Sequence, residues 1–97
     1  MDYVEFEWDD AKAASNYRKH GVRFSEAVTI WKDESAIEVA DLDHSTHEER
    51  WVRIGLSVDI RVIVVVYTER FLGFKVRVIS ARKATAVEVE QYMVRKI

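Results

Sequence analysis

The first residues of the chain alternate between apolar and polar side chains and then change to a helical pattern. Over residues 3–8 the apolar side chains fall at every second position, which predicts a half-buried strand. Asp9 or Asp10 is placed to cap a helix that continues to about Lys19. Gly21 follows it, where a helix commonly ends in the left-handed conformation.

The remaining pattern predicts four more strands and two more helices. They are a short helix over 25–31, a strand over 36–40, three strands over 50–57, 61–70 and 74–82, and a helix after Thr85. The last helix begins with a capping box, because Thr85 and Glu88 are spaced to bond each other's free backbone amides. The apolar run 62–66 is typical of a central strand that is covered on both faces, at least partly.

This order of elements, β-α-α-β-β-β-β-α, predicts one α+β domain over residues 1–97, with the helices packed on one face of an antiparallel sheet. A chain of 97 residues is the size of one domain. It has no cysteine, which excludes disulfides and thiolate metal sites. Its beginning is acidic where a signal peptide needs a basic region, and its longest apolar run is far shorter than a membrane helix. We therefore expect a soluble cytoplasmic domain that does not contact a membrane.

The net charge of −2 hides an asymmetry between the two halves of the chain. Residues 1–50 carry 13 acidic and 6 basic side chains, whereas residues 51–97 carry 4 acidic and 9 basic ones. A basic second half favours binding of a polyanion such as RNA. Pairing of the two halves with each other explains the same asymmetry.

The two faces of the predicted sheet differ in chemistry, because side chains alternate across a strand. One face is apolar throughout and is expected to cover the core; its members are Val52, Ile54, Leu56, Val62, Val64, Val66, Phe74, Val76 and Val78. The other face mixes aliphatic with charged and phenolic groups; its members are Trp51, Arg53, Arg61, Ile63, Val65, Tyr67, Glu69, Lys75, Arg77 and Ile79. We predict that this mixed face carries the chemistry. The alternative is a solvated face whose charges pair across strands.

Matching these faces also predicts which residues are opposite each other in the hairpins. The expected pairs are Ser57–Arg61, Trp51–Tyr67, Tyr67–Arg77 and Glu69–Lys75. The row Trp51–Tyr67–Arg77 then crosses three strands, with Glu69 one pleat away. An aromatic ring, a phenol, a guanidinium and a carboxylate are thus expected within reach of one small ligand.

These groups are sufficient to cleave RNA without a metal. A base takes the proton of the 2′-hydroxyl, cations stabilise the crowded phosphorane, and an acid protonates the departing 5′-oxygen. Glu69 is the candidate base, and Arg61 and Arg77 are the candidate phosphate ligands. Tyr67 or a histidine is the candidate acid, and aromatic rings such as Trp51 can hold an unstacked base.

The histidines offer little support for a metal site. His20 ends the first predicted helix, where the helix dipole alone favours a histidine. His44 and His47 lie in an acidic loop over 41–49 whose spacing matches no metal motif, and a solvated loop is the simpler interpretation. The sequence contains no Gly-rich phosphate loop and no nucleophile elbow. We expect no metal and no cofactor.

An ordered series of short motifs over about residues 6–92 resembles the BrnT family of bacterial toxins. The motifs are Trp8-Asp9, Lys12, Asn16, Lys19-His20-Gly21-Val22, Phe24, Asp43-His44-Ser45, Glu49-Arg50, Ile54-Gly55-Leu56-Ser57, Arg61, Thr68-Glu69-Arg70, Arg77-Val78-Ile79-Ser80-Ala81-Arg82, Ala84, Glu88 and Tyr92. Two positions differ from the family pattern: Ile60 stands where a glycine is common, and Asp10 where a proline is common.

The resemblance implies a type II toxin with a RelE-like fold that cleaves RNA without a metal and inhibits translation and growth. It also implies neutralisation by a BrnA antitoxin, which brings the DNA-binding domain of the complex. The residues expected to be catalytic are Arg61, Glu69, Arg77, Tyr67 and His20, and those expected to bind RNA are Arg82, Lys75, Lys19, Arg53 and Trp51. Lys19 and His20 rest on the motif alone, and a helix-capping role fits them equally well. By strand parity Arg82 belongs to the apolar face, but it ends its strand and can turn toward the site.

Two other functions fit the same residues. A non-catalytic module that binds a partner helix across its sheet is favoured by Ile63, Val65 and Ile79, which lie beside arginines. An RNA-binding domain without cleavage fits less well, because Glu69 repels phosphate unless Lys75 pairs with it.

Overall fold

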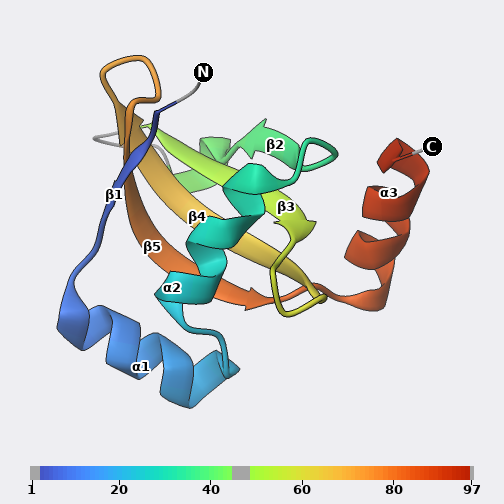
Figure 1. Ribbon diagram of the computed structural model, residues 1–97, viewed down its shortest axis with the longest axis horizontal. Coiled ribbons are helices and arrows are strands. Elements are labelled where there is room, and N and C mark those ends of the chain that lie inside the picture. Colours follow the sequence, from blue (N-terminus) through green and yellow to red (C-terminus); the bar gives the residue numbers. More distant parts are fainter. Residues whose placement is uncertain (1–2, 45–48, 97) are drawn as a thin grey trace.

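One five-stranded sheet organises the protein, which the computed structural model describes over residues 3–44 and 49–96. The strands lie in the order β1-β5-β4-β3-β2 (Figure 1). Their bounds are β1 Glu5–Glu7, β2 Ile37–Ala40, β3 Arg50–Leu56, β4 Val62–Arg70 and β5 Lys75–Lys83. Strands β2 to β5 pair antiparallel, but β1 runs parallel to β5. The predicted α+β class is confirmed, and the prediction of an antiparallel sheet is wrong at β1. The first helix follows β1 and lies beyond the C-terminal end of β5 (Figure 1). To reach this helix, β1 runs in the same direction as β5.

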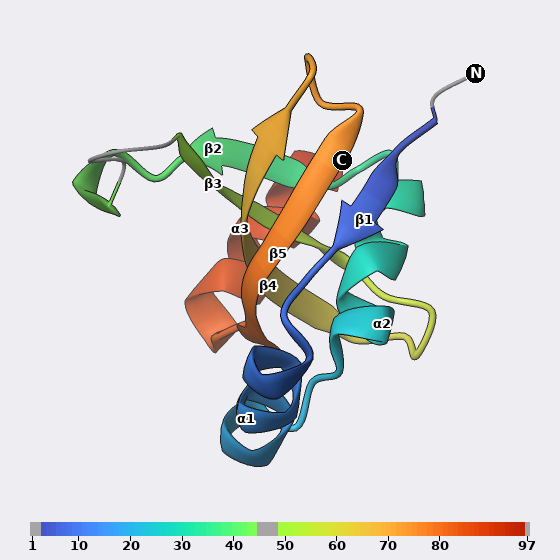
Figure 2. The ribbon, with the colours of Figure 1, turned by 90° about the vertical axis from the view of Figure 1, so that its left-hand side faces the viewer.

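The helices cover both faces of this sheet. They are α1 Asp10–His20, α2 Phe24–Ala27 with its 3-10 continuation η1 Val28–Lys32, the 3-10 turn η2 Leu42–His44, and α3 Ala86–Lys96. Figure 2 shows α2 and α3 on opposite sides of the sheet. The prediction that the helices pack on one face is therefore wrong. Both faces of β3 and β4 are apolar, so each face needs a cover. None of the helices in the described ranges combines the length and apolar character needed to cross a membrane.

The helix ends follow the local signals in the sequence. The Asp9 carboxylate accepts the Lys12 backbone N–H at 3.0 Å, and Gly21 ends α1 with φ 69°. At α3 the Glu88 backbone N–H donates to the Thr85 hydroxyl at 3.2 Å, and the Thr85 N–H donates to the Glu88 carboxylate at 2.8 Å. The predicted N-cap, C-terminal glycine and capping box are confirmed.

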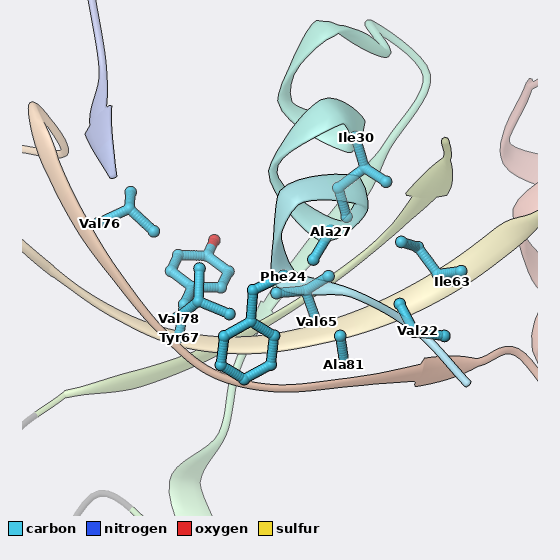
Figure 3. Packing of buried hydrophobic residues seen from close by; sticks show 10 residues of the cluster. All are labelled: Val22, Phe24, Ala27, Ile30, Ile63, Val65, Tyr67, Val76, Val78 and Ala81. Carbon is cyan, nitrogen blue, oxygen red and sulfur yellow. The ribbon is translucent and has the colours of Figure 1, made fainter. Parts of the chain in front are cut away.

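The main core lies between the sheet and α2 with η1 (Figure 3). Its buried residues are Val22, Phe24, Ala27, Ile30, Ile63, Val65, Tyr67, Val76, Val78 and Ala81. Ile63, Val65 and Tyr67 belong to the face that the sequence pattern assigned to chemistry. That assignment is wrong for the central strand: the aliphatic members of the mixed face form the core, because the apolar side of α2 and η1 packs on them.

The apolar face of β3 and β4 is covered by α3 and forms a second, smaller core. Tyr92 packs there against Ile54 and Val64, and its hydroxyl donates to the Asp33 carboxylate at 2.6 Å. Phe74, which the pattern assigned to this core, lies outside β5 and is 58% exposed. The prediction for Phe74 is wrong because the strand begins one residue later. The prediction that Val76 and Val78 share this apolar face is wrong, because both lie in the main core.

The register is confirmed in one hairpin and wrong in the other. In the first hairpin Trp51 lies opposite Tyr67, and the Ser57 N–H donates to the Arg61 carbonyl at 3.0 Å, as predicted. In the second hairpin Val66 faces Ser80, but its neighbour Tyr67 faces Val78. Ile79 is therefore an extra residue, which makes a β-bulge on β5.

The bulge reverses the alternation of side chains along β5. Before it, Val76 and Val78 turn to the main core and Arg77 turns to the other face, opposite Thr68. After it, Ala81 turns to the main core, and Arg82 joins Arg77 on the face away from that core. The expected pairs Tyr67–Arg77 and Glu69–Lys75 do not form. The row of site residues across three strands is broken at β5.

Candidate functional site

The structure separates the predicted catalytic residues instead of bringing them together. Arg61 and Glu69 lie at opposite ends of β4, eight residues and about 26 Å apart along an extended strand. They border two different cavities, and Arg77 lines neither. The expectation that these three residues share one hollow is wrong, because the bulge turns Arg77 to the other face and because β4 is long.

Arg61, which is half-buried, is held in an ion pair with the buried Glu26. Its guanidinium donates to both carboxylate oxygens of Glu26, at 2.7 and 2.5 Å, and to the Gly21 carbonyl at 2.9 Å. Glu26 is only 7% exposed and also accepts the Ser57 hydroxyl at 2.6 Å. The hydrogen bonds from Arg61 lower the pKa of Glu26 below its ordinary value, although burial acts in the opposite direction. These contacts tie the turn after α1 to the first hairpin, which is a structural role.

We predict that Arg61→Ala destabilises the protein by about 2 kcal/mol, because it leaves the buried Glu26 carboxylate without its cation. The ion pair lowers the pKa of Glu26, so its stabilisation is present above the ordinary value of 4.5 and is lost as the pH falls. Urea unfolding at pH 7 and at about pH 3 measures this difference, which is expected to shrink at the lower pH. Arg95→Ala, at an exposed position on α3, is the control and is expected to be neutral within about 0.5 kcal/mol. Equal stability of both variants at pH 7 contradicts the structural role.

Glu69 lies in a hollow of about 320 Å³ under the β4–β5 turn, with Trp31, Glu38 and Arg53 among its lining residues. Burial raises the pKa of Glu69, and the nearby carboxylates of Glu38 and Glu49 raise it further. Arg53 donates to Glu38 at 3.0 Å and lies over the Trp31 ring.

Two predicted aromatic site residues are close to this hollow but belong to the core. Tyr67 is fully buried, its hydroxyl donates to Glu38, and burial raises its pKa far above the ordinary value. Trp51 is half-buried and packs against the main core. The fully buried Tyr67 ring offers no open face on which an RNA base can stack.

A third place, between α1 and β5, brings together residues that suit RNA cleavage. A hollow of about 220 Å³ is lined by Lys12, Ser15, Asn16, Lys19, His20, Ile79 and Ser80. Lys19 and His20 occupy the last turn of α1, which Gly21 ends. Ile79 and Ser80 come from the bulge of β5. The hollow therefore combines a proton donor or acceptor, His20, with two ammonium groups and two hydroxyls.

Asn16 connects the two sides of this hollow, α1 and β5, by hydrogen bonds. Its side-chain amide donates to the carbonyls of Val22 and Ala81, at 3.0 and 2.8 Å, and accepts the Ala81 N–H at 3.1 Å. Asn16 is only 7% exposed, so these bonds are made in the interior. They fix α1 beside the bulge, and thereby set where Lys19 and His20 lie relative to Ser80.

The sheet face next to this hollow carries further cations. Arg77 lies 3.8 Å from the Glu7 carboxylate, and this long contact between exposed groups holds its guanidinium only weakly. Lys75 lies at the other end of β5, 3.3 Å from the Glu5 carboxylate, where it lines a hollow at the β4–β5 turn.

Arg82 is held more firmly on the same face, about 7 Å along β5 from Ser80. Its guanidinium donates twice to Glu88 of α3, at 2.7 and 2.9 Å, and lowers the pKa of Glu88 to about 2. Of the ten predicted site residues, four lie in this hollow or on the sheet face beside it: Lys19, His20, Arg77 and Arg82.

Two important residues were missed or given no role in the sequence interpretation. The series of motifs contains Asn16 without giving it a role, and Glu26 is absent from the predicted site. Both are polar residues on the buried face of a helix, and Glu26 directly precedes the apolar residues Ala27 and Val28. A polar side chain inside an apolar stripe is the available signal, since buried polar groups need partners.

The described ranges contain no group of three histidine and acidic side chains arranged to hold a metal ion. Of the loop considered for metal ligands, His44 lies in η2 and His47 lies outside the described residues.

Comparisons with known proteins identify a family for this chain and a solved structure with a similar fold. A family model described as "Ribonuclease toxin, BrnT, of type II toxin-antitoxin system" matches residues 8–88. The crystal structure of the Brucella abortus ribonuclease toxin BrnT is similar in fold, with a TM-score of 0.60 and 24% sequence identity over 88% of this chain and 97% of that chain. A search of curated proteins finds no match. The class is that of the ribonuclease toxins of type II toxin–antitoxin systems. Within it, the chain belongs to the BrnT family.

Proposed function

We propose that this toxin is an endoribonuclease that cuts RNA without a metal ion in the hollow between α1 and β5. One observation carries the proposal: His20 and Lys19 from α1 and Ser80 from β5 line a single hollow, which opens beside a sheet face that holds Arg77 and Arg82. Histidine exchanges protons near neutral pH, and lysine and arginine are the usual ligands of phosphate.

In the proposed reaction His20 removes the proton of a 2′-hydroxyl. The resulting oxygen attacks the adjacent phosphorus, a 2′,3′-cyclic phosphate forms, and the bond from phosphorus to the 5′-oxygen breaks. The departing oxygen takes a proton from an acid in the hollow, for which the ammonium group of Lys12 or Lys19 is available. Arg77 and Arg82 attract the flanking phosphates. Arg61, Tyr67 and Glu69 lie away from the hollow and take no part in this step.

As part of the same function, RNA cleavage inhibits translation and growth, and a BrnA-type antitoxin neutralises the toxin. The antitoxin contributes the DNA-binding part of the complex, and the RelE-like fold class belongs to the same proposal. Membership of a type II family supports a partner of this kind.

The proposal predicts that the purified protein cuts single-stranded RNA in excess EDTA. We expect products with 5′-hydroxyl and 2′,3′-cyclic phosphate ends, because the attacking group belongs to the RNA. Gel analysis of end-labelled RNA, with and without phosphatase treatment of the ends, measures both. Cleavage that stops in EDTA and returns with Mg²⁺ contradicts metal independence. RNA left uncut at a stoichiometric ratio favours the alternative of a non-catalytic interaction module.

A further inference from the structure

An exposed apolar patch lies at the turn between β4 and β5, which projects from the sheet near the N-terminal strand (Figure 1). We call it the hairpin patch; it consists of Tyr3, Phe71, Leu72 and Phe74, which are 57, 71, 99 and 58% exposed. Its members are contiguous. Tyr3 and Phe74 line a hollow of about 420 Å³ together with Phe71. The same two residues line the hollow beside Glu69 together with Leu72. Clustered apolar side chains on a surface commonly mark a binding site.

The backbone of this turn is unfavourable for the residues that occupy it. Phe71 and Leu72 have φ values of 54° and 56°, in the left-handed region, and Gly73 follows with φ 87°. Bulky side chains rarely adopt this conformation, whereas asparagine and glycine tolerate it. Two large apolar residues therefore stand where folding alone favours asparagine or glycine.

A carboxylate that is unpaired within the described residues lies beneath the same turn. Glu69 is half-buried and makes no hydrogen bond or ion pair within residues 3–44 and 49–96. A Cβ added at Gly73 would lie 3.5 Å from its Oε2 atom, which places the carboxylate directly under the turn. Glu38, in the same hollow, is already bonded to Arg53 and Tyr67. The patch thus joins apolar surface to a carboxylate that has no pairing partner in the described part of the chain.

We propose that the hairpin patch is a docking surface for the antitoxin, and that it receives an amphipathic segment with basic side chains. Apolar side chains of this segment pack on Phe71, Leu72 and Phe74, and a lysine or arginine pairs with Glu69. This docking surface depends on the proposed function, because it requires the antitoxin partner of a type II toxin. Arg53 and Lys75 also line the two hollows, but they are paired with Glu38 and Glu5. The carboxylate of Glu69 is left to repel phosphate, so a protein with basic side chains fits better than RNA.

Figure 1 places the hairpin patch at the opposite end of the sheet from α1. The patch therefore anchors the antitoxin outside the hollow that holds His20. A change in the patch is expected to alter antitoxin binding without altering RNA cleavage by the free toxin.

Leu72→Asn tests the docking surface, with the antitoxin encoded beside the toxin gene as the probe. Asparagine removes the apolar contact and fits the left-handed backbone, so the variant keeps or gains stability. We expect its affinity for the antitoxin, measured by titration calorimetry, to fall by roughly tenfold or more. Ile60→Asn is the matched control: Ile60 is 82% exposed with φ 59°, at the turn between β3 and β4. It is expected to gain the same stability and to keep full affinity.

Glu69→Gln tests the ion pair separately, because it keeps the shape of the side chain and removes the charge. We expect a loss of affinity of roughly fivefold or more, and a weaker dependence of binding on salt than in the parent protein. Unchanged affinity in both Leu72→Asn and Glu69→Gln overturns the docking surface. Loss of RNA affinity, with antitoxin binding intact, overturns it in favour of an RNA contact. An antitoxin that fails to bind the parent protein overturns both this inference and the partner in the proposed function, whereas RNA cleavage tests the rest of that function independently.

Discussion

Replacing Asn16 with alanine is expected to lower the free energy of unfolding by about 3 kcal/mol, because three buried backbone groups lose their partner at once. The carbonyls of Val22 and Ala81 and the N–H of Ala81 are left without the amide, and α1 loses its fastening to the bulge of β5. In a domain of this size the change corresponds to a fall in the thermal midpoint of more than about 10 °C. Circular dichroism during heating measures it.

The matched control is Ser15→Ala. Ser15 is the neighbour of Asn16 on α1 and lines the same hollow, but it is expected to alter stability by less than about 0.5 kcal/mol. At a temperature where both variants are folded, we expect Asn16→Ala to cut RNA more slowly than Ser15→Ala, because Lys19 and His20 are no longer held beside Ser80. Equal stability of the two variants contradicts the role of the Asn16 amide.

The elements of the fold follow from signals that are local in the sequence. Asp9 and Gly21 delimit α1, and Thr85 with Glu88 begins α3, because a cap is completed by residues three or four positions apart. The first hairpin keeps strict alternation on both strands, so matching the apolar faces is enough to place Trp51 opposite Tyr67.

The second hairpin was mispredicted because of one residue. Ile79 fits a regular strand as well as a bulge, and nothing in its neighbours shows that it is the extra residue. That residue decides which face Val76, Arg77 and Arg82 occupy. Which face of the sheet carries the main core also depends on a distant segment. Ile63 and Val65 are buried because α2 and η1 pack on them, and these segments precede β4 by some thirty residues.

The candidate site was mispredicted for a related reason. An arginine chosen by type alone is as suitable for a buried carboxylate as for a phosphate. Arg61 pairs with Glu26, which is 35 residues away in the sequence, and its guanidinium stabilises the fold. His20 was placed in the site by a motif only, and the geometry gives it neighbours: Lys19 on its own helix, and Ser80 from a strand sixty residues further along.

His20→Ala is expected to lower the rate of RNA cleavage about 100-fold or more, because it removes the proposed proton acceptor of the reaction. The stability is expected to change by less than about 1 kcal/mol, since His20 is exposed at the end of α1 and contributes there mainly through the helix dipole. Single-turnover cleavage of one defined RNA, measured across pH, tests the role. The pH–rate profile of the parent protein is expected to differ from that of the variant, because the variant lacks the proposed proton acceptor.

Glu69→Ala distinguishes this site from the one that the sequence pattern suggested, because Glu69 lies at the far end of β4. We expect it to leave the chemical step of cleavage close to that of the parent, while His20→Ala abolishes most of it. The opposite result, with Glu69→Ala inactive and His20→Ala active, transfers the reaction to the hollow under the β4–β5 turn. In that case Glu69 and Arg53 form the chemical site, and the hollow between α1 and β5 serves only to bind the RNA backbone. Loss of activity in both variants, with both still folded, indicates that the RNA spans the sheet from one end to the other.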